Sequence, residues 1–260
     1  MNQLDAKSVV VGVNGSQAAV NAAKWAIDEA YGRHLPLRLV YVIPGTRPET
    51  GWSGASEWDL ERGETVLAEA ECAVQSAARG AGKPVEVETA ILSGDPAPVL
   101  TTESQHAALV CVGTSRRGWA TDGSLGPTAA ALVTQAHCPV AIIRTNPDGS
   151  PTQLGVIAVV LNDEPDNDEV VRLAMEEARR RHATVRQIDR RLDSWVRRYP
   201  DVPVQVVASG TGARAAESHS GAIDLAVVGE ADADQLPGLV TPNCHPILGY
   251  PDCSVLLVRH

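Results

Sequence analysis

The residue types and spacing best suited to chemistry occur between positions 112 and 133, VGTSRRGWATDGSLGPTAAALV. An apolar strand end is followed there by glycines at Gly113, Gly118, Gly123 and Gly126, and then by an alanine-rich helix start. Glycine permits positive φ and close approach of the backbone, and a loop that wraps a phosphate group needs both. A tight strand-to-helix connection uses glycine for the same reasons. The stretch is therefore either an anion-binding loop or an ordinary turn.

The helix that follows this loop is predicted to have Gly126 as its N-cap and Pro127 as its first residue. The main-chain amides of Thr128 and Ala129 then point out of the helix start, where the helix dipole also favours an anion. Arg116 is open to two interpretations. Its guanidinium can pair with a phosphate, but a residue other than glycine can also keep the loop from closing tightly.

A second group of candidate positions ends the strands expected beside this loop. Gly12, Val13 and Asn14 close the first apolar run, and Asn14 begins an Asn-Gly pair. The Asn14 side chain is either a simple turn former or a ligand to a bound molecule. Val42, late in the second apolar run, is either a core residue or a source of main-chain groups for a bound ligand. We predict that these positions meet the glycine loop in one site.

Apolar runs and helical patterns alternate along the first half of the chain, and these elements must position the candidate residues. Continuous β-branched runs are typical of strands buried on both faces, and here they are VVVGV, LRLVYVI, VEVETAI, ALVCVG and VAIIR. The spacing of apolar residues predicts helices over 18–32 and 61–79, and a shorter helix fits 97–106. The tryptophans of 51–58 are expected to be anchored in the core. The alternation predicts a parallel sheet with helices on both faces.

The second half of the chain repeats the pattern of the first. Residues 9–34 align without a gap on 157–182, and the closing strands of the two halves also match. The long middle section 43–84 shrinks in the second half to about 190–201. There, the spacing of Leu192, Trp195, Val196 and Tyr199 predicts a short amphipathic helix in place of the longer one.

The joint between the halves is TNPDGSPTQ, residues 145–153, which is rich in turn formers and has no apolar periodicity. A repeat of this length indicates two equivalent domains, because the units of a solenoid are far shorter. We therefore predict an α/β protein of two tandem domains, 1–147 and 152–260.

Composition indicates a soluble globular protein. Apolar residues make up 44% and charged residues 21%, and no apolar run approaches the roughly 20 residues of a membrane span. The net charge of −10 would repel a nucleic acid backbone. The start of the chain lacks the pattern of an export signal, so we expect a cytoplasmic protein. The five cysteines form no C-x-x-C pair and are expected to be reduced, mostly core thiols that bind no metal.

Residues 9–30, VVVGVNGSQAAVNAAKWAIDEA, resemble the opening of the universal stress protein family, which has an apolar strand, an aspartate-glycine-serine turn and a helix. Residues 112–144 resemble the closing segment of that family, in which spaced glycines precede a serine or threonine. The chain is identified as a tandem member over nearly its whole length. The resemblance implies, for each domain, a Rossmann-like parallel sheet of about five strands, of the adenine nucleotide alpha hydrolase-like type. It also implies ATP bound at the carboxyl ends of the strands, where the main-chain groups of Val42 would meet the adenine ring.

Three positions depart from the family pattern. Carried over by position, Gly113 and Gly126 match the first and last motif glycines, while Arg116 replaces the second glycine. Pro127 replaces the serine or threonine and removes one donor. Asn14 replaces an aspartate and lacks the charge that helps to hold magnesium, so the metal dependence of binding should weaken.

The second half departs further. It keeps Gly229, but Asp163, Glu164 and Asp232 occupy turn and loop positions of the expected phosphate site, and Pro242 stands level with the last motif glycine. Each exposed carboxylate would repel a phosphate by about 1 kcal/mol. We expect no nucleotide in this half.

Three functions fit these observations. The first is a regulatory stress-response protein that binds ATP within residues 1–147 and is not an enzyme. The second is a nucleotide-free scaffold whose domains pair through VAIIR and VLLVR and associate into a homodimer. The third, a weak ATP hydrolase, ranks last because no general base is visible. No nucleic acid or membrane partner is expected.

Overall fold

The computed structural model of the chain describes residues 7–43, 45, 56–115, 125–146, 148–152, 155–159, 167–188, 193–207, 223–230 and 253–259. Contacts divide the chain into two compact units, of which the first comprises 1–118 and 126–151 and the second 119–125 and 152–260. Both units contain parallel strands and helices, so the predicted α/β class is confirmed.

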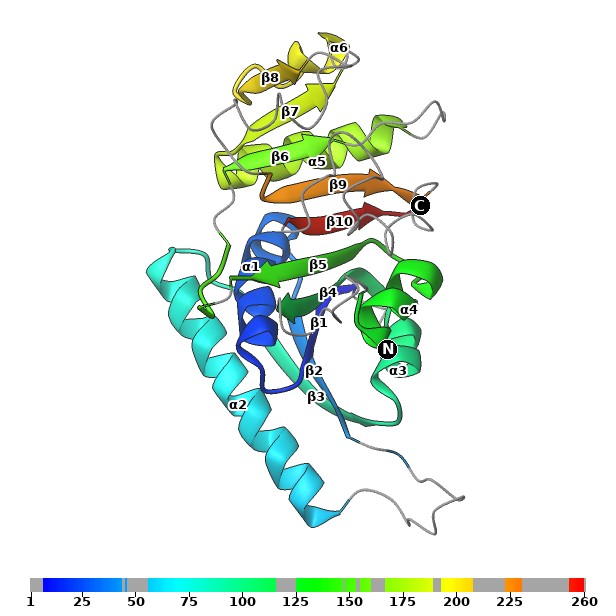
Figure 1. Cartoon of the computed structure of the whole chain (residues 1–260). Helices are drawn as coiled ribbons and strands as arrows, with labels where there is room; N and C mark the ends of the chain where they lie inside the picture. The colour runs from blue at the N-terminus through cyan, green and yellow to red at the C-terminus, as the bar shows by residue number, and fades with distance from the viewer. Residues whose placement is uncertain are drawn as a thin grey trace, which may run out of the picture. The chain divides into compact units, whose positions relative to one another are not determined.

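The sheet of the first unit contains five described strands. They are β1 (Ser8–Val13), β2 (Leu37–Ile43), β3 (Val87–Ser93), β4 (Ala107–Ser115) and β5 (Val140–Thr145). Their order is β3-β2-β1-β4-β5, and every neighbouring pair is parallel (Figure 1). β5 is buried along its whole length and β1 nearly so, as the continuous apolar runs predicted.

Helices cover both faces of this sheet. They are α1 (Gln17–Arg33), α2 (Glu57–Gly80), α3 (Pro96–Glu103) and α4 (Pro127–Gln135). α1 and α2 pack together on one face, and α3 and α4 pack together on the other (Figure 1). No helix in the described part of the chain is long and apolar enough to cross a membrane.

The second unit has the same strand order as the first. Its described strands are β6 (Val156–Val159), β7 (Thr184–Ile188), β8 (Val204–Val207), β9 (Leu225–Gly229) and β10 (Ser254–Val258). They run β8-β7-β6-β9-β10 in parallel, and α5 (Asn167–Arg181) packs against β6 and β9. The predicted amphipathic helix is shorter than expected, because α6 spans only Asp193–Val196.

α2 begins earlier than predicted and presents a tryptophan to solvent. Ser56 and Asp59 form a capping box, in which the main-chain N–H of Ser56 donates to Asp59 Oδ2 at 2.9 Å. Hydrogen bonds from Ser56 hold the pKa of Asp59 below its ordinary value. The first buried residue of the helix is Gly63, so its first turn projects beyond the packed face. Trp58 is therefore 79% exposed, so its expected place in the core is wrong, while Trp52 lies outside the described residues.

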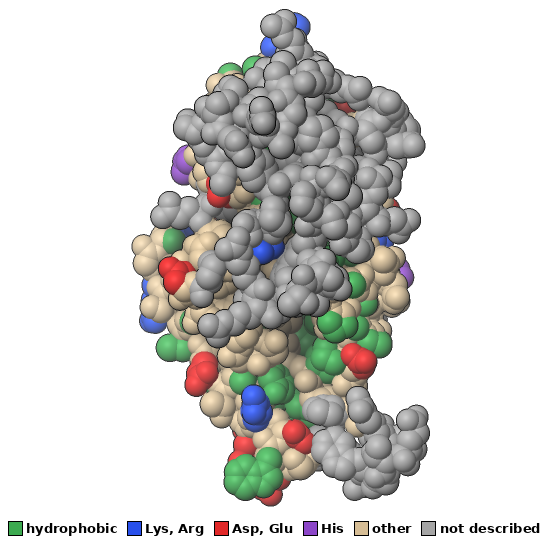
Figure 2. Space-filling model, viewed as in Figure 1, with side chains coloured by type: hydrophobic (Ala, Val, Ile, Leu, Met, Phe, Trp, Pro, Cys, Tyr) green, Lys and Arg blue, Asp and Glu red, His purple; other side chains and the backbone are tan. Residues whose placement is uncertain are grey.

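Charged side chains of both signs are interspersed on the described surface of the face shown in Figure 2. This distribution and the net charge of −10 give that surface no segregated basic face of the kind that binds a nucleic acid backbone.

α1 and α5 end in the same backbone conformation. His34 follows α1 with φ of 56°, and His182 follows α5 with φ of 53°. Both side chains are exposed. An L-residue in this left-handed region costs about 1–2 kcal/mol, whereas glycine adopts it freely.

Replacing His34 by glycine is therefore expected to raise the free energy of unfolding by about 0.5 kcal/mol, because the greater freedom of glycine in the unfolded chain offsets part of the gain. Chemical denaturation measures the change. Lys24→Gly, at an exposed position inside α1, is the control and is expected to lower the free energy by about 1 kcal/mol. Equal losses from both substitutions would contradict the assigned conformation.

Candidate functional site

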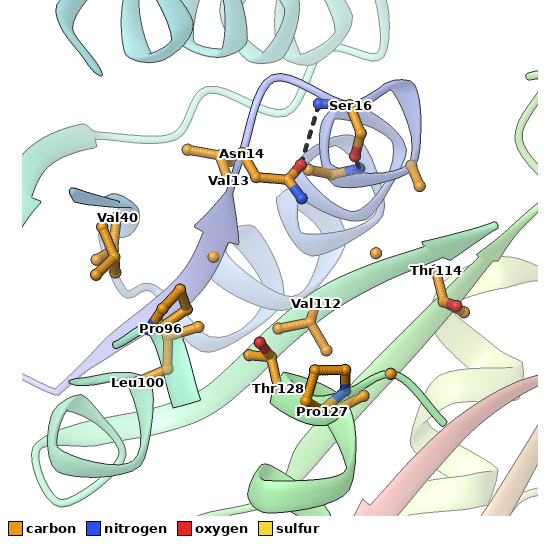
Figure 3. A pocket seen from close by; sticks show the side chains of 17 residues that line it. Val13, Asn14, Ser16, Val40, Pro96, Leu100, Val112, Thr114, Pro127 and Thr128 are labelled. Atoms are coloured by element: carbon orange, nitrogen blue, oxygen red, sulfur yellow. Dashed lines mark hydrogen bonds between the residues drawn. The ribbon is translucent and has the colours of Figure 1, made fainter. Parts of the chain in front are cut away.

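A cavity of about 350 Å³ opens where the carboxyl ends of β1, β2 and β4 meet the starts of α1, α3 and α4 (Figure 3). Open parallel sheets generally bind ligands at this edge, outside the carboxyl ends of their strands. The volume is within the usual range of small-molecule sites, which begins at about 300 Å³. The cavity is therefore the candidate binding site of the first unit.

The structure brings nearly all of the sequence-predicted site residues together around this cavity. The predicted residues that line it are Gly12, Val13, Asn14, Val42, Gly113, Gly126, Pro127, Thr128 and Ala129. Arg116 lies outside the described residues, as do Gly118 and Gly123 of the same loop. The cavity thus joins positions more than 110 residues apart in sequence, from Asn14 to Thr128.

The turn after β1 sets the orientation of Asn14. The main-chain N–H of Ser16 donates to Asn14 Oδ1 at 3.0 Å, and Gly15 between them has φ of +81° (Figure 3). Ser16 then caps α1, because its Oγ accepts from the main-chain N–H of Ala19 at 3.2 Å. The asparagine is both a turn former and part of the cavity wall, so the two interpretations of Asn14 are compatible.

Gly113 is needed for packing between elements. A Cβ added there would overlap the main-chain carbonyl of Ala18 and would lie 2.6 Å from the main-chain nitrogen of Ala19. β4 can approach the first turn of α1 this closely only because residue 113 has no side chain. This glycine therefore shapes the cavity by bringing its two walls together.

Gly126 differs from Gly113 in both space and conformation. A Cβ added at Gly126 would meet no atom within 4 Å, and the backbone has φ of −59°, which other residues adopt readily. The described residues around Gly126 thus neither crowd the position nor impose a conformation that only glycine adopts.

The start of α4 differs from the other helix starts at the cavity. Side chains cap α1 and α3, since Ser16 accepts from Ala19 and Asp95 Oδ1 accepts from the main-chain N–H of Ala97 at 3.2 Å. α4 has Gly126 as its N-cap and no side-chain cap hydrogen bond. Pro127 occupies its first position, as predicted. The first turn of α4 is thus the end of a helix that a ligand can cap.

The opposite part of the cavity is apolar. Sequence reasoning identified Val42 there but missed Val40, Pro96, Leu100 and Val112, which also line the cavity. Pro96 begins α3 directly after the Asp95 cap. The Asp-Pro pair after the third apolar run was the available signal, because a helix start at that strand end must lie at the same edge of the sheet.

The polar part of the lining carries no charge. Besides Asn14, its polar side chains are the hydroxyls of Ser16, Thr114 and Thr128, and no ionisable side chain is among the described residues of the wall. Elsewhere in the described part of the chain, no group of three or more histidine, cysteine, aspartate or glutamate residues is placed to hold a metal ion. The described lining therefore offers a ligand main-chain dipoles and neutral polar side chains, and no charged side chain.

The corresponding region of the second unit lies largely outside the described residues. Gly229 ends β9, as Gly113 lies near the end of β4, and a Cβ added at Gly229 would lie 3.2 Å from Val170 of α5. Asp163, Glu164, Asp232 and Pro242 are not described. The expected lack of a nucleotide in this unit stays a prediction.

Comparisons with known proteins agree with the fold. A family model described as "Universal stress protein family" matches residues 6–144. Universal stress protein Rv2624c of Mycobacterium tuberculosis is 40% identical over 269 residues, covering 97% of this chain and 96% of the relative. Universal stress protein Rv3134c of the same organism is 36% identical, covering 92% and 94%.

A solved structure shares the architecture at lower identity. The crystal structure of a universal stress protein from Archaeoglobus fulgidus DSM 4304 matches with a TM-score of 0.67 and 14% identity, covering 98% of this chain and 96% of that one. This match supports the Rossmann-like α/β fold, while the sequence matches identify the family. The chain belongs to the universal stress protein family.

Proposed function

We propose that the first unit binds an adenine nucleotide in the cavity, with its phosphates at the start of α4, and that the protein is a regulator and not an enzyme. The observation that carries this proposal is the α4 start, which lacks a side-chain cap where it meets a cavity with neutral donors. A helix start of this kind favours an anion through its main-chain amides and its dipole.

The arrangement of the cavity suits a ligand with one charged and one flat apolar end. Thr128 and Ala129 bring main-chain amides and one hydroxyl to the α4 side, and the valines and Leu100 supply apolar walls on the other. A phosphate and an aromatic base separated by a sugar match these two ends. The choice of adenine and of ATP rests on the family resemblance.

A regulatory role agrees with the chemistry of the lining. Its described polar side chains are hydroxyls and one amide, and none of them is a general base at neutral pH. Nucleotide binding would then act by favouring one conformation or partner contact over another.

We also propose that the two units are tandem domains, 1–147 and 152–260, with the nucleotide confined to the first.

Calorimetric titration with ATP tests the proposal, together with the substitution Pro127→Ser. The wild-type protein is expected to bind, and ATP at 100 times its dissociation constant should stabilise it by about 2.7 kcal/mol. Pro127→Ser restores a main-chain donor at the first position of α4, which should tighten binding by about 1 kcal/mol, or roughly fivefold. Denaturing the purified protein and analysing the released molecules checks for bound nucleotide.

The outcomes separate the proposal from the scaffold function. If the wild-type protein binds no ATP while Pro127→Ser does, Pro127 prevents nucleotide binding. The protein is then better explained as a nucleotide-free scaffold that associates into a homodimer. Turnover of ATP at a rate of about 1 per second or more would instead establish an enzyme.

A further inference from the structure

We infer that the cavity takes its phosphate-bearing ligand as the free anion and not as a magnesium complex, because Asn14 presents a hydrogen-bond donor to the ligand. This inference rests on the proposed function and adds to it the form of the nucleotide that is bound. It concerns one atom, the amide nitrogen Nδ2 of Asn14, and the absence of carboxylates from the described lining.

The turn after β1 determines which end of the Asn14 amide faces the cavity. The main-chain N–H of Ser16 is a donor, so the Asn14 atom 3.0 Å from its nitrogen must be the acceptor Oδ1. Nδ2 must then point away from Ser16, and Figure 3 shows it on the cavity side of the side chain. Reversing the amide would place two donors face to face and lose this hydrogen bond. Asn14 therefore offers N–H groups to the ligand.

The other described polar atoms of the wall do not form a magnesium site. Magnesium in proteins is held through one or two carboxylates in addition to substrate phosphates, in octahedral oxygen coordination. The hydroxyl of Ser16 already accepts the α1 cap hydrogen bond, and Asp95, the nearest acid in sequence to the wall residue Pro96, caps α3. No side-chain oxygen of the described lining carries a charge, so these residues do not fit the ion.

A donor at Asn14 suits a free polyphosphate. Each N–H of Nδ2 can donate to an anionic oxygen, and such charge-assisted hydrogen bonds are stronger than neutral ones. Magnesium on those oxygens would compete with the donor for the same lone pairs. The metal thus weakens the contact that Asn14 makes.

Asn14→Asp changes this chemistry with little change of shape. One carboxylate oxygen can keep the hydrogen bond from the Ser16 N–H, and the other takes the place of Nδ2 and converts the donor into a charged acceptor. The substitution should therefore repel free ATP and attract a magnesium ion. Gln105→Glu makes the same amide-to-carboxylate change at an exposed position beyond the end of α3, away from the cavity, and serves as the control.

Calorimetric titrations with ATP in EDTA and in excess magnesium test the inference. Wild type and Gln105→Glu are expected to bind ATP in EDTA as tightly as in magnesium, or more tightly. Asn14→Asp is expected to bind roughly tenfold more weakly in EDTA and to recover most of that loss in magnesium. Circular dichroism confirms that each variant is folded.

Different results would overturn the inference and the proposed function. Wild-type binding that needs magnesium would overturn the free-anion inference and leave nucleotide binding intact, and this result does not depend on the variant folding. If wild type and folded Asn14→Asp bind ATP with equal affinity in EDTA, the Asn14 side chain does not contact the phosphates. A wild-type protein that binds ATP in neither buffer would end the proposed function and the inference with it.

Discussion

Gly113→Ala is expected to lower the free energy of unfolding by about 3 kcal/mol, the upper end of the usual cost of overpacking a core. The added methyl group would overlap the carbonyl of Ala18 and lie 2.6 Å from the main-chain nitrogen of Ala19. Both obstructing groups belong to the backbone of α1, so no side-chain rotation relieves the overlap. Either β4 or the first turn of α1 must move.

Gly126→Ala is the matched control for this substitution. Its added methyl group meets no atom within 4 Å, and the backbone conformation at residue 126 suits alanine. We expect a change within about 0.5 kcal/mol. Thermal and urea denaturation of the two variants beside wild type measure the difference. Equal stability of both variants would show that β4 and α1 do not pack as closely as described.

This pair of glycines shows what could be predicted about the loop from sequence. Their spacing, together with the family resemblance, assigned Gly113 and Gly126 to one site, and both line the cavity. Their separate roles depend on distances between elements, because residue 113 is crowded by a helix that begins at residue 17. A sequence motif gives the positions of the glycines, but it does not show which neighbouring atoms exclude a side chain at each of them.

Strand positions followed from the sequence because each apolar run corresponds to a strand. Burial on both faces holds for β1 and β5, but it is wrong for β3, which lies at the end of the strand order and has no buried residue. The run LRLVYVI corresponds to the full span of β2, and VAIIR falls one residue short of β5. Helix boundaries were less accurate where polar chemistry decides them. α2 starts at Glu57 instead of 61 because the Ser56–Asp59 capping box extends it beyond its apolar stripe.

The cavity was predicted more completely at its polar end than at its apolar end. Asn14, Thr128 and Ala129 stand out in the sequence because polar residues and helix starts interrupt apolar runs. Val40 and Val112 lie inside such runs, where a residue that faces the cavity looks like any core residue. Their role depends on where the strands end relative to one another, which the register of the sheet determines.

Thr128→Glu is expected to weaken ATP binding by about 2 kcal/mol, or roughly 30-fold, through repulsion between the new carboxylate and the phosphates. Thr128 is the second residue of α4 and lines the cavity. A glutamate there should not harm the fold, because acidic side chains near a helix start stabilise it by about 0.3–1 kcal/mol. Loss of ATP binding with an unchanged or raised free energy of unfolding would therefore show that the substitution acts on the contact with the phosphates and not on the fold.

Thr134→Glu provides the control, because it makes the same replacement at an exposed position near the other end of α4. It changes the net charge equally and leaves the cavity lining intact, so ATP affinity should stay within about twofold of wild type at 0.15 M salt, where charges separated by more than about 8 Å are largely screened. Calorimetry on both variants measures the contrast. If Thr128→Glu binds ATP as tightly as wild type, the phosphates do not lie at the start of α4, because a carboxylate beside a polyanion repels it.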